Sequence, residues 1–262
     1  MNLNLTGKRA LVCGSTQGIG LAAATEIAAL GASVTLLARN GESLKAAAEG
    51  LPAKDGQNHD WLAADFAKPE EVRSAVEGHL DPARPYHILV NNSGGPPPGT
   101  ALDIKPADLL ACLNAQLVCA VMLAQVLVPQ FRAAGYGRII NVISTSVKQP
   151  IPNLGVSNTV RAAVASWAKT LSAEVGPWGV TVNNVLPGYT STERLASLIK
   201  GRAAKSGATE EKVAQDLIAT IPAGRFGKPE ELGAAIAFLA SPAAGYISGI
   251  NLPVDGGRLG CL

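Results

Sequence analysis

The sequence predicts a doubly wound α/β protein with three layers, in which helices cover both faces of a mainly parallel seven-stranded sheet. Three observations lead to this fold class. Short apolar runs alternate with longer helical patterns along the chain, which is typical of repeated strand–helix–strand units. A glycine-rich turn follows the first apolar run. The length of 262 residues suits one large domain, residues 1–262, better than two small ones.

The strands are predicted from short apolar runs, and the helices from longer segments with helical spacing of apolar residues. The strands cover, in chain order, residues 9–13, 33–38, 61–64, 87–91, 138–143, 181–186 and 250–254. The helices between and after them cover 21–30, 42–49, 70–80, 106–133, 159–175 and 229–239. Because helices connect successive strands, we expect parallel pairing with right-handed crossovers.

Two segments interrupt this alternation. Residues 94–99 read Gly-Gly-Pro-Pro-Pro-Gly, which excludes a helix or a central strand because proline has no N–H donor. Residues 190–221 form a long polar insertion after a strand. We expect this insertion to be a lid over a substrate site, and the alternative is a solvated helical face, given its charged residues Lys200, Arg202, Lys205, Glu210, Glu211 and Lys212.

Composition argues against several classes of protein. Charged residues make up 16% of the chain and the net charge is +2, so nothing favours nucleic-acid binding. The longest apolar runs, such as residues 117–128, are too short to span a bilayer, and this one contains Gln125. Residues 1–6 lack the basic start and long apolar run of a signal peptide. We therefore expect a cytoplasmic protein that has no membrane or nucleic-acid partner.

The four cysteines do not indicate a metal site. None of them is paired in a Cys-x-x-Cys spacing, and the three histidines lie apart from them in the sequence. We expect no metal and no disulfide framework, and interpret the cysteines as reduced, mostly buried thiols.

The first strand leads into a turn with the spacing Gly-x-x-x-Gly-x-Gly. Glycine tolerates a tight turn and lets the backbone approach phosphates, and the following helix offers free N–H groups at its positive end. A strand before and a helix after the turn are the context that a dinucleotide site requires. The turn therefore predicts a nicotinamide dinucleotide whose pyrophosphate contacts Gly14, Ser15, Gln17, Gly18, Ile19 and Gly20. The alternative is a purely structural turn.

The end of the second strand distinguishes between the two nicotinamide cofactors. A site for NAD usually has a carboxylate there for the ribose 2′-hydroxyl, whereas this chain has Arg39 and Asn40. A guanidinium can pair with a 2′-phosphate. The sequence favours NADP(H), with NAD(H) as the alternative if Arg39 is an ordinary surface arginine.

The order of motifs resembles the short-chain dehydrogenase/reductase family over essentially the whole chain, with 3-oxoacyl-acyl-carrier-protein reductases as the most similar type. The family has a Rossmann-type dinucleotide-binding domain. Besides the glycine turn, the resemblance rests on Asp65, Asn91-Asn92-Ser93-Gly94, Asn114, Ser144, Pro187-Gly188, Thr192, the run from Arg225 to Glu231, and the run from Gly249 to Gly257.

The resemblance implies roles for the matched positions. On the adenosine side of the cofactor it places Asp65, Phe66, Asn91, Ser93 and Gly94. At the nicotinamide end it places Pro187, Gly188, Thr190 and Thr192. Asn114 would hold a water molecule, and Ser144 would polarise the substrate carbonyl. Each has a simpler structural explanation, such as the end of a strand for Asn91 or a capping residue for Ser144.

The chain departs from the family at its catalytic pair. Family enzymes have Tyr-x-x-x-Lys about 13 residues beyond the serine, and these positions are Ser157 and Arg161 here. None of the four tyrosines in the chain has lysine four residues later. A phenol with a pKa near 10 can donate a proton to a developing alkoxide, whereas a serine hydroxyl is far less acidic. Arg161 could keep the contacts of the lysine to the cofactor ribose and its positive field, but it is no proton shuttle.

Three functional hypotheses follow. The first is an oxidoreductase that reduces a carbonyl or oxidises an alcohol, with Asn114, Ser144, Ser157 and Arg161 at its catalytic site and a proton from water, substrate or Tyr189. The second is a cofactor-binding protein with little redox turnover, acting as a sensor or partner subunit. The third is a non-redox lyase or isomerase. We favour the first, because a protein that only binds cofactor has no need for a serine at the position of hydride transfer.

The long helix of residues 106–133 also bears on assembly. Between residues 109 and 128 it is apolar around much of its circumference, so more than one face can be buried. We expect a homotetramer, as in similar proteins, with a dimer as the alternative.

Overall fold

A computed structural model describes residues 1–54 and 56–261, and these fold around one parallel sheet. The strand order is β3-β2-β1-β4-β5-β6-β7, and every neighbouring pair is parallel. The strands are β1 (Arg9–Cys13), β2 (Ser33–Ala38), β3 (Asp60–Ala63), β4 (Ile88–Asn91), β5 (Gly137–Val142), β6 (Val180–Pro187) and β7 (Asn251–Val254). The doubly wound fold class is confirmed, and each predicted strand boundary is correct to within one residue.

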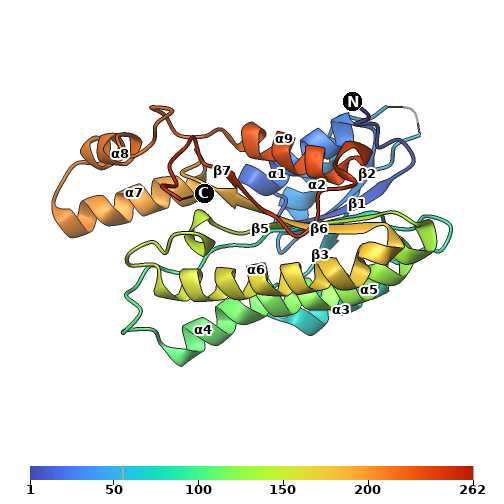
Figure 1. The fold of residues 1–262 in the computed structure, drawn as a ribbon, viewed down its shortest axis with the longest axis horizontal. Helices are drawn as coiled ribbons and strands as arrows, with labels where there is room; N and C mark the ends of the chain where they lie inside the picture. Colours follow the sequence, from blue (N-terminus) through green and yellow to red (C-terminus); the bar gives the residue numbers. More distant parts are fainter. Residues whose placement is uncertain (55, 262) are drawn as a thin grey trace.

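Helices cover both faces of the sheet (Figure 1). On one face lie α1 (Gly18–Ala29), α2 (Gly41–Glu49) and α9 (Pro229–Ala240), and on the other α3 (Pro69–Glu77), α4 (Pro106–Leu113), α5 (Cys119–Ala134) and α6 (Gly155–Val175). Side chains of each central strand alternate between the two faces, so Val12 joins the core beneath α1 while Leu11 joins the core beneath α5. Helical turns η2 (Thr145–Val147), η3 (Gly176–Trp178) and η4 (Pro242–Ala244) complete these layers.

The long predicted helix is not a regular α-helix throughout. A π-helical turn, η1 (Asn114–Val118), separates α4 from α5, and the N–H of Cys119 donates to the carbonyl of Asn114. Such turns often occur at functional sites. The combined stretch Pro106–Ala134 has 29 residues and could cross a membrane by length and composition. The prediction from the sequence rested only on uninterrupted apolar runs, which are shorter than this combined stretch. In the fold this stretch packs against α3, α6 and the sheet.

Residues 190–221 form a helical pair that extends beyond the sandwich (Figure 1). The pair consists of α7 (Glu193–Ser206) and α8 (Glu210–Ile218). It has a small core of its own, centred on Leu195, Val213 and Leu217 and closed by Tyr189 and Phe226. Most of its charged side chains are exposed. The insertion is thus a folded helical unit that lies beside the carboxyl ends of the strands.

A row of four asparagines crosses four neighbouring strands. Asn91, Asn141, Asn184 and Asn251 lie directly opposite one another in the strand register. Each side-chain nitrogen donates to the side-chain oxygen of the next residue, at 2.8, 2.9 and 2.8 Å in that order. Because the amides satisfy one another inside the sheet, this asparagine row can be buried at little cost.

Candidate active site

The turn between β1 and α1 is built around three glycines. Gly14 (φ +58°) and Gly18 (φ +56°) have left-handed backbone conformations, which side chains disfavour. A Cβ on Gly20 would lie 2.1 Å from the carbonyl oxygen of Gly14, and one on Gly14 would lie 2.7 Å from the side-chain nitrogen of Asn92. The three glycines therefore permit a tight turn. Because they have no side chains, a phosphate can approach the backbone of the turn at these positions.

The N-terminus of α1 adjoins this turn. The N–H of Leu21 donates to the carbonyl of Gln17, so the N–H groups before Leu21 have no partner within the helix. A helix end of this kind attracts phosphate. Ser15 and Ile19, which were expected to contact cofactor, differ in their surroundings. Ser15 is fully buried and its hydroxyl accepts a hydrogen bond from the N–H of Leu37 at 3.1 Å, whereas Ile19 is only partly buried. The Ser15 side chain supports the turn, so a ligand would meet its backbone.

The adenosine side of the crevice lies over β1, β2 and β4. The strand order reverses between β1 and β4, and open α/β sheets bind ligands at such a point. Arg39 follows β2, is exposed, and forms no ion pair among the described residues. Asp65 lies beyond β3, half-buried, and its Oδ1 accepts a hydrogen bond from the N–H of Ala67 at 3.0 Å.

The first turn of α7 contacts both sides of the crevice. On the side of the glycine turn, Gln17 Nε2 donates to Glu193 Oε2 at 3.0 Å. On the opposite side, Arg194 Nη2 donates to the carbonyl oxygen of Pro96 at 2.7 Å. Thr192 caps the helix by accepting from the N–H of Leu195. The start of the insertion therefore bridges the crevice above the sheet.

The loop after β6 forms the expected nicotinamide end. Pro187 ends the strand, and Gly188 packs so closely on Asp255 that a Cβ would lie 2.7 Å from it. Thr190 is buried and its hydroxyl donates to the carbonyl of Gly188 at 3.3 Å. Tyr189 points elsewhere, toward Arg258, whose Nη2 donates to its hydroxyl at 3.5 Å. No hydrogen bond in the described part of the chain joins Tyr189 to Ser144 or Ser157, so the structure gives no support to Tyr189 as proton source.

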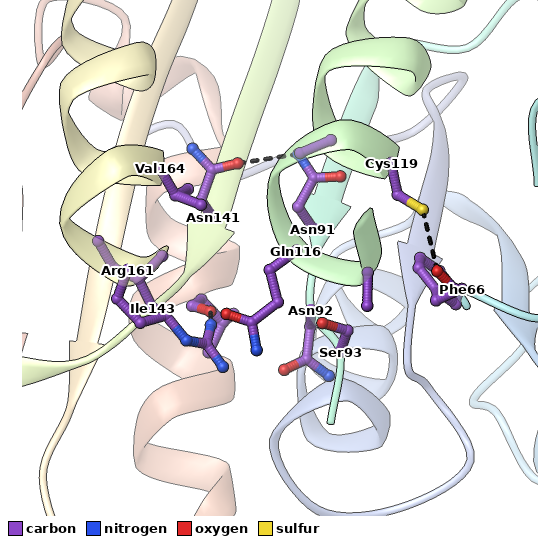
Figure 2. Close-up of a pocket in the computed structure, with 13 residues that line it drawn as sticks. Phe66, Asn91, Asn92, Ser93, Gln116, Cys119, Asn141, Ile143, Arg161 and Val164 are labelled. Atoms are coloured by element: carbon purple, nitrogen blue, oxygen red, sulfur yellow. Dashed lines mark hydrogen bonds between the residues drawn. The ribbon is translucent and has the colours of Figure 1, made fainter. Parts of the chain in front are cut away.

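A small pocket lies at the ends of β4 and β5 (Figure 2). Residues predicted to bind the cofactor, such as Asn91 and Ser93, line this pocket together with Arg161, which was predicted to be catalytic. The lining residues are Phe66, Asn91, Asn92, Ser93, Ala115, Gln116, Cys119, Ala120, Asn141, Val142, Ile143, Arg161 and Val164. Burial raises the pKa of the Cys119 thiol to about 12, which makes it a poor nucleophile at neutral pH.

Arg161 is a buried cation without a carboxylate partner. Its Nη1 donates to the carbonyl oxygen of Val142 at 2.6 Å, and no ion pair involves it among residues 1–54 and 56–261. Within the part of the chain that the structure describes, its Nε has no hydrogen-bond partner, and neither has Oε1 of Gln116 in the same pocket. Burial lowers the pKa of the guanidinium to about 10, and the positive charge of Arg194 acts in the same direction. The site therefore holds an uncompensated positive charge.

The remaining predicted catalytic residues are not among the residues that line this pocket. Ser144 follows β5 and its Oγ accepts a hydrogen bond from the N–H of Ser146 at 3.1 Å, which leaves its hydroxyl proton free to donate. It caps η2, which packs against α6. Ser157 lies on α6 one turn before Arg161 and is partly exposed. Asn114 begins η1 and is partly exposed.

Comparisons with known proteins agree with this geometry. Residues 14–258 match the family described as enoyl-(acyl carrier protein) reductase. The chain is 32% identical to a 3-oxoacyl-[acyl-carrier-protein] reductase of Aquifex aeolicus, over 98% of this chain and 99% of the relative. A similar enzyme of Vibrio cholerae is 34% identical, over 97% and 98%. The chain belongs to the short-chain dehydrogenase/reductase family.

Solved structures of this family have the same architecture. L-sorbose reductase from Gluconobacter frateurii, complexed with NADPH and L-sorbose, superposes with a TM-score of 0.93 at 34% identity and full coverage of both chains. A putative NAD(P)-dependent gluconate 5-dehydrogenase from Beutenbergia cavernae, with bound NADP, has a TM-score of 0.89 at 31% identity, again over both full chains. The dehydrogenase/reductase resemblance drawn from the motifs is thus confirmed for the family and the fold.

Sequence reasoning did not identify three polar residues at the site. Asn92 was noted only as part of its motif, but its Nδ2 donates to the carbonyl of Gly14 at 3.0 Å and so ties β4 to the glycine turn. The Nε2 of Gln116 donates a hydrogen bond to the carbonyl oxygen of Gly94 at 3.0 Å. Arg194 was not among the candidate residues. No pattern in the sequence distinguishes these side chains from ordinary surface or core polar residues.

Proposed function

We propose that this protein is an NADP(H)-binding oxidoreductase that reduces a carbonyl or oxidises an alcohol of a small-molecule substrate. One observation supports this function above others. The free hydroxyl proton of Ser144 and the cation of Arg161 lie at the same end of the sheet as the tight glycine turn. A hydrogen-bond donor and a positive charge are what a carbonyl needs when hydride arrives at its carbon.

The residues at the crevice fit a dinucleotide. The close approach of Gly20 to Gly14 leaves the cradle for pyrophosphate free of side chains. We assign the pyrophosphate to residues 14–20, the adenosine half to Arg39, Asp65, Phe66, Asn91, Ser93 and Gly94, and the nicotinamide half to Arg161, Pro187, Gly188, Thr190 and Thr192. The exposed guanidinium after β2 supports NADP(H), with NAD(H) as the weaker ligand. The NADPH complex of L-sorbose reductase also supports this choice.

Reversing the charge at Arg39 tests the cofactor choice. Arg39→Asp removes the partner of the 2′-phosphate and adds a carboxylate for a ribose hydroxyl. We expect NADPH to bind about 10- to 100-fold more weakly, as for loss of a charged hydrogen bond, while NADH binding improves. Fluorescence titration with both cofactors measures the ratio. Lys45→Asp on the exposed side of α2 is the control for general charge effects, and an unchanged NADPH to NADH ratio in Arg39→Asp would contradict the assignment.

In the proposed reaction, the bound cofactor supplies or accepts hydride, and the residues of the chain stabilise the substrate oxygen. Ser144 donates its hydroxyl proton in a hydrogen bond to that oxygen, while its own Oγ stays fixed by the N–H of Ser146. The Arg161 guanidinium, held by the Val142 carbonyl, stabilises the negative charge that develops there. The proton that completes the alcohol comes from water or from the substrate. We assign Asn114, which begins the π-helical turn and is partly exposed, to hold such a water.

We further propose that Ser157 and Arg161 replace the Tyr-x-x-x-Lys pair of the family. Their spacing from Ser144 and their positions one turn apart on α6 support this assignment. The replacement also favours a second function, a cofactor-binding subunit or sensor with little redox turnover, because loss of a positioned acid typically costs about 10²- to 10⁴-fold in rate.

A turnover assay separates the two functions. Purified protein is mixed with NADPH and a panel of ketones, quinones and β-ketoacyl thioesters, and NADPH consumption is followed by absorbance. We expect consumption above background with at least one ketone. Tight NADPH binding without any consumption would reject the oxidoreductase and favour the binding protein.

We also propose a homotetramer, or a dimer, located in the cytoplasm. Leu110 on α4 is exposed although it is apolar, and much of the stretch Pro106–Ala134 is not covered by its own chain. Such a face suits contact with another subunit. Cys13, Cys112 and Cys119 are buried free thiols, as suits a reducing compartment. Light scattering coupled to size-exclusion chromatography gives the subunit number.

A further inference from the structure

Two arginines reach the substrate end of the crevice from opposite layers. Arg161 comes from α6 and lines the pocket with Ser93 and Ile143 (Figure 2). Arg194 comes from the first turn of α7, where its guanidinium lies over Gly95, within 3.3 to 3.5 Å of the position of a Cβ there. The positive charge of Arg194 also lowers the pKa of Arg161, so the two guanidinium groups are near enough to interact.

Neither guanidinium has an anionic partner. No carboxylate of the described residues lies within 4 Å of either one. Among the described residues, Arg161 donates only to the Val142 carbonyl, and Arg194 only to the Pro96 carbonyl. The nearest acid along the chain, Glu193, is turned to Gln17 on the other side of the crevice. Arg194 is exposed, whereas Arg161 is buried. An isolated buried cation such as Arg161 is costly, and it is normally retained where a counter-charge arrives.

The nicotinamide half of the cofactor, to which Arg161 is assigned above, offers this guanidinium neutral ribose hydroxyls rather than a counter-charge. The pyrophosphate is assigned to the glycine turn and α1, which lie on the opposite face of the sheet from α6. The unpartnered Nε of Arg161 and the unpartnered Oε1 of Gln116 lie on the α6 side (Figure 2). The missing negative charge therefore belongs to a second molecule.

We propose that the substrate is an oxo acid or hydroxy acid, whose carboxylate binds between Arg161 and Arg194 while its carbonyl or hydroxyl meets Ser144. The planar fork of a guanidinium matches a carboxylate with two parallel hydrogen bonds. Arg194 is already held near this position by its hydrogen bond to the carbonyl oxygen of Pro96. The inference rests on the oxidoreductase function proposed above and specifies its substrate class.

Binding of matched acids and esters tests the proposal without turnover. The full-length protein saturated with NADP⁺ is titrated calorimetrically with pyruvate, acetoacetate and 4-oxopentanoate, and with their methyl esters. We expect at least one acid to bind about tenfold or more tightly than its ester. Arg194→Met should weaken that acid about tenfold and leave the ester and NADP⁺ unchanged, whereas Arg194→Lys should retain part of the preference. Lys200→Met, an exposed position on the same helix, serves as control.

The outcomes separate this inference from the proposed function. Equal binding of acids and esters, failure of all three acids to bind, or equal weakening of acid and ester by Arg194→Met would overturn the carboxylate site. If esters consume NADPH as well as acids do, the oxidoreductase stands and the inference falls. If an acid binds selectively but no compound consumes NADPH, the anion site stands and the redox function falls.

Discussion

Ser157→Tyr combined with Arg161→Lys is expected to raise kcat for NADPH-dependent carbonyl reduction by about 10²-fold. That factor corresponds to about 2.7 kcal/mol of barrier at 1.36 kcal/mol per tenfold change in rate. The physical reason is the acidity of the donor. A phenol with a pKa near 10, next to an ammonium, delivers a proton to the developing alkoxide, whereas a serine hydroxyl does not.

The structure is favourable for this substitution. Position 157 is partly exposed at the start of α6, one turn before position 161, so a larger side chain has solvent on one side. Ser144 caps η2, against which α6 packs, so the new hydroxyl can approach the same substrate oxygen. The measurement is steady-state kcat and KM on the best ketone of the panel.

Single variants provide the controls. Ser157→Tyr alone places a phenol beside a guanidinium, and Arg161→Lys alone supplies an ammonium without a phenol, so each should gain less than the pair. Circular dichroism and NADPH titration establish that each variant folds and binds. A correctly folded double variant whose kcat is unchanged or lower would indicate that the pocket is built for different chemistry.

Gly20→Ala is expected to disable cofactor binding and to lower the melting temperature. The added Cβ would lie 2.1 Å from the carbonyl oxygen of Gly14 and 2.8 Å from the side chain of Asn92. To relieve the first contact the backbone of the turn itself would have to move, which costs more free energy than moving a flexible side chain. Overpacking of this kind costs about 1–3 kcal/mol, or about 2–12 °C in Tm for a chain of this size. Displacement of the turn should cost hydrogen bonds to the charged pyrophosphate and so weaken NADPH binding by about 10- to 100-fold.

Gly201→Ala gives the matched control for a glycine in a helix. Gly201 lies in α7, and a Cβ there meets nothing within 4 Å. Alanine should stabilise this helix by about 0.5–1 kcal/mol. Calorimetric Tm and fluorescence titration with NADPH are measured for both variants. Wild-type affinity for NADPH in Gly20→Ala would show that the turn does not carry the phosphate.

The strands could be predicted well from the sequence because burial on both faces leaves a clear apolar run. β1 and β2 were predicted to the residue, at 9–13 and 33–38. Helix starts were less accurate. α6 begins at Gly155 rather than 159, since tight packing of Gly155 on Ala101 holds a first turn whose residues have weak helical preference. Similarly, α1 begins at Gly18, within the glycine turn itself.

The site could be predicted only where a motif implies a backbone shape. The glycine turn is of this kind, because its spacing corresponds to a local conformation. The π-helical turn at Asn114 has no such signal, since its extra residue is accommodated by packing between α3 and α6. Arg194 could not be found for a related reason. Its role depends on where the insertion folds back, and in the sequence it is one of several exposed charged residues in that insertion.

The asparagine row has a consequence for folding kinetics. Its three links join residues 50, 43 and 67 positions apart, so none can form until distant segments of the chain have met. A slip of β5 by two residues would place Ile139 or Ile143 opposite Asn91 and leave buried amides unpaired, at about 1–3 kcal/mol each. Sheets with a shifted register are therefore less stable, so their strands can separate and pair again. The row selects the correct register late in folding, when the apolar strands alone would tolerate several alignments.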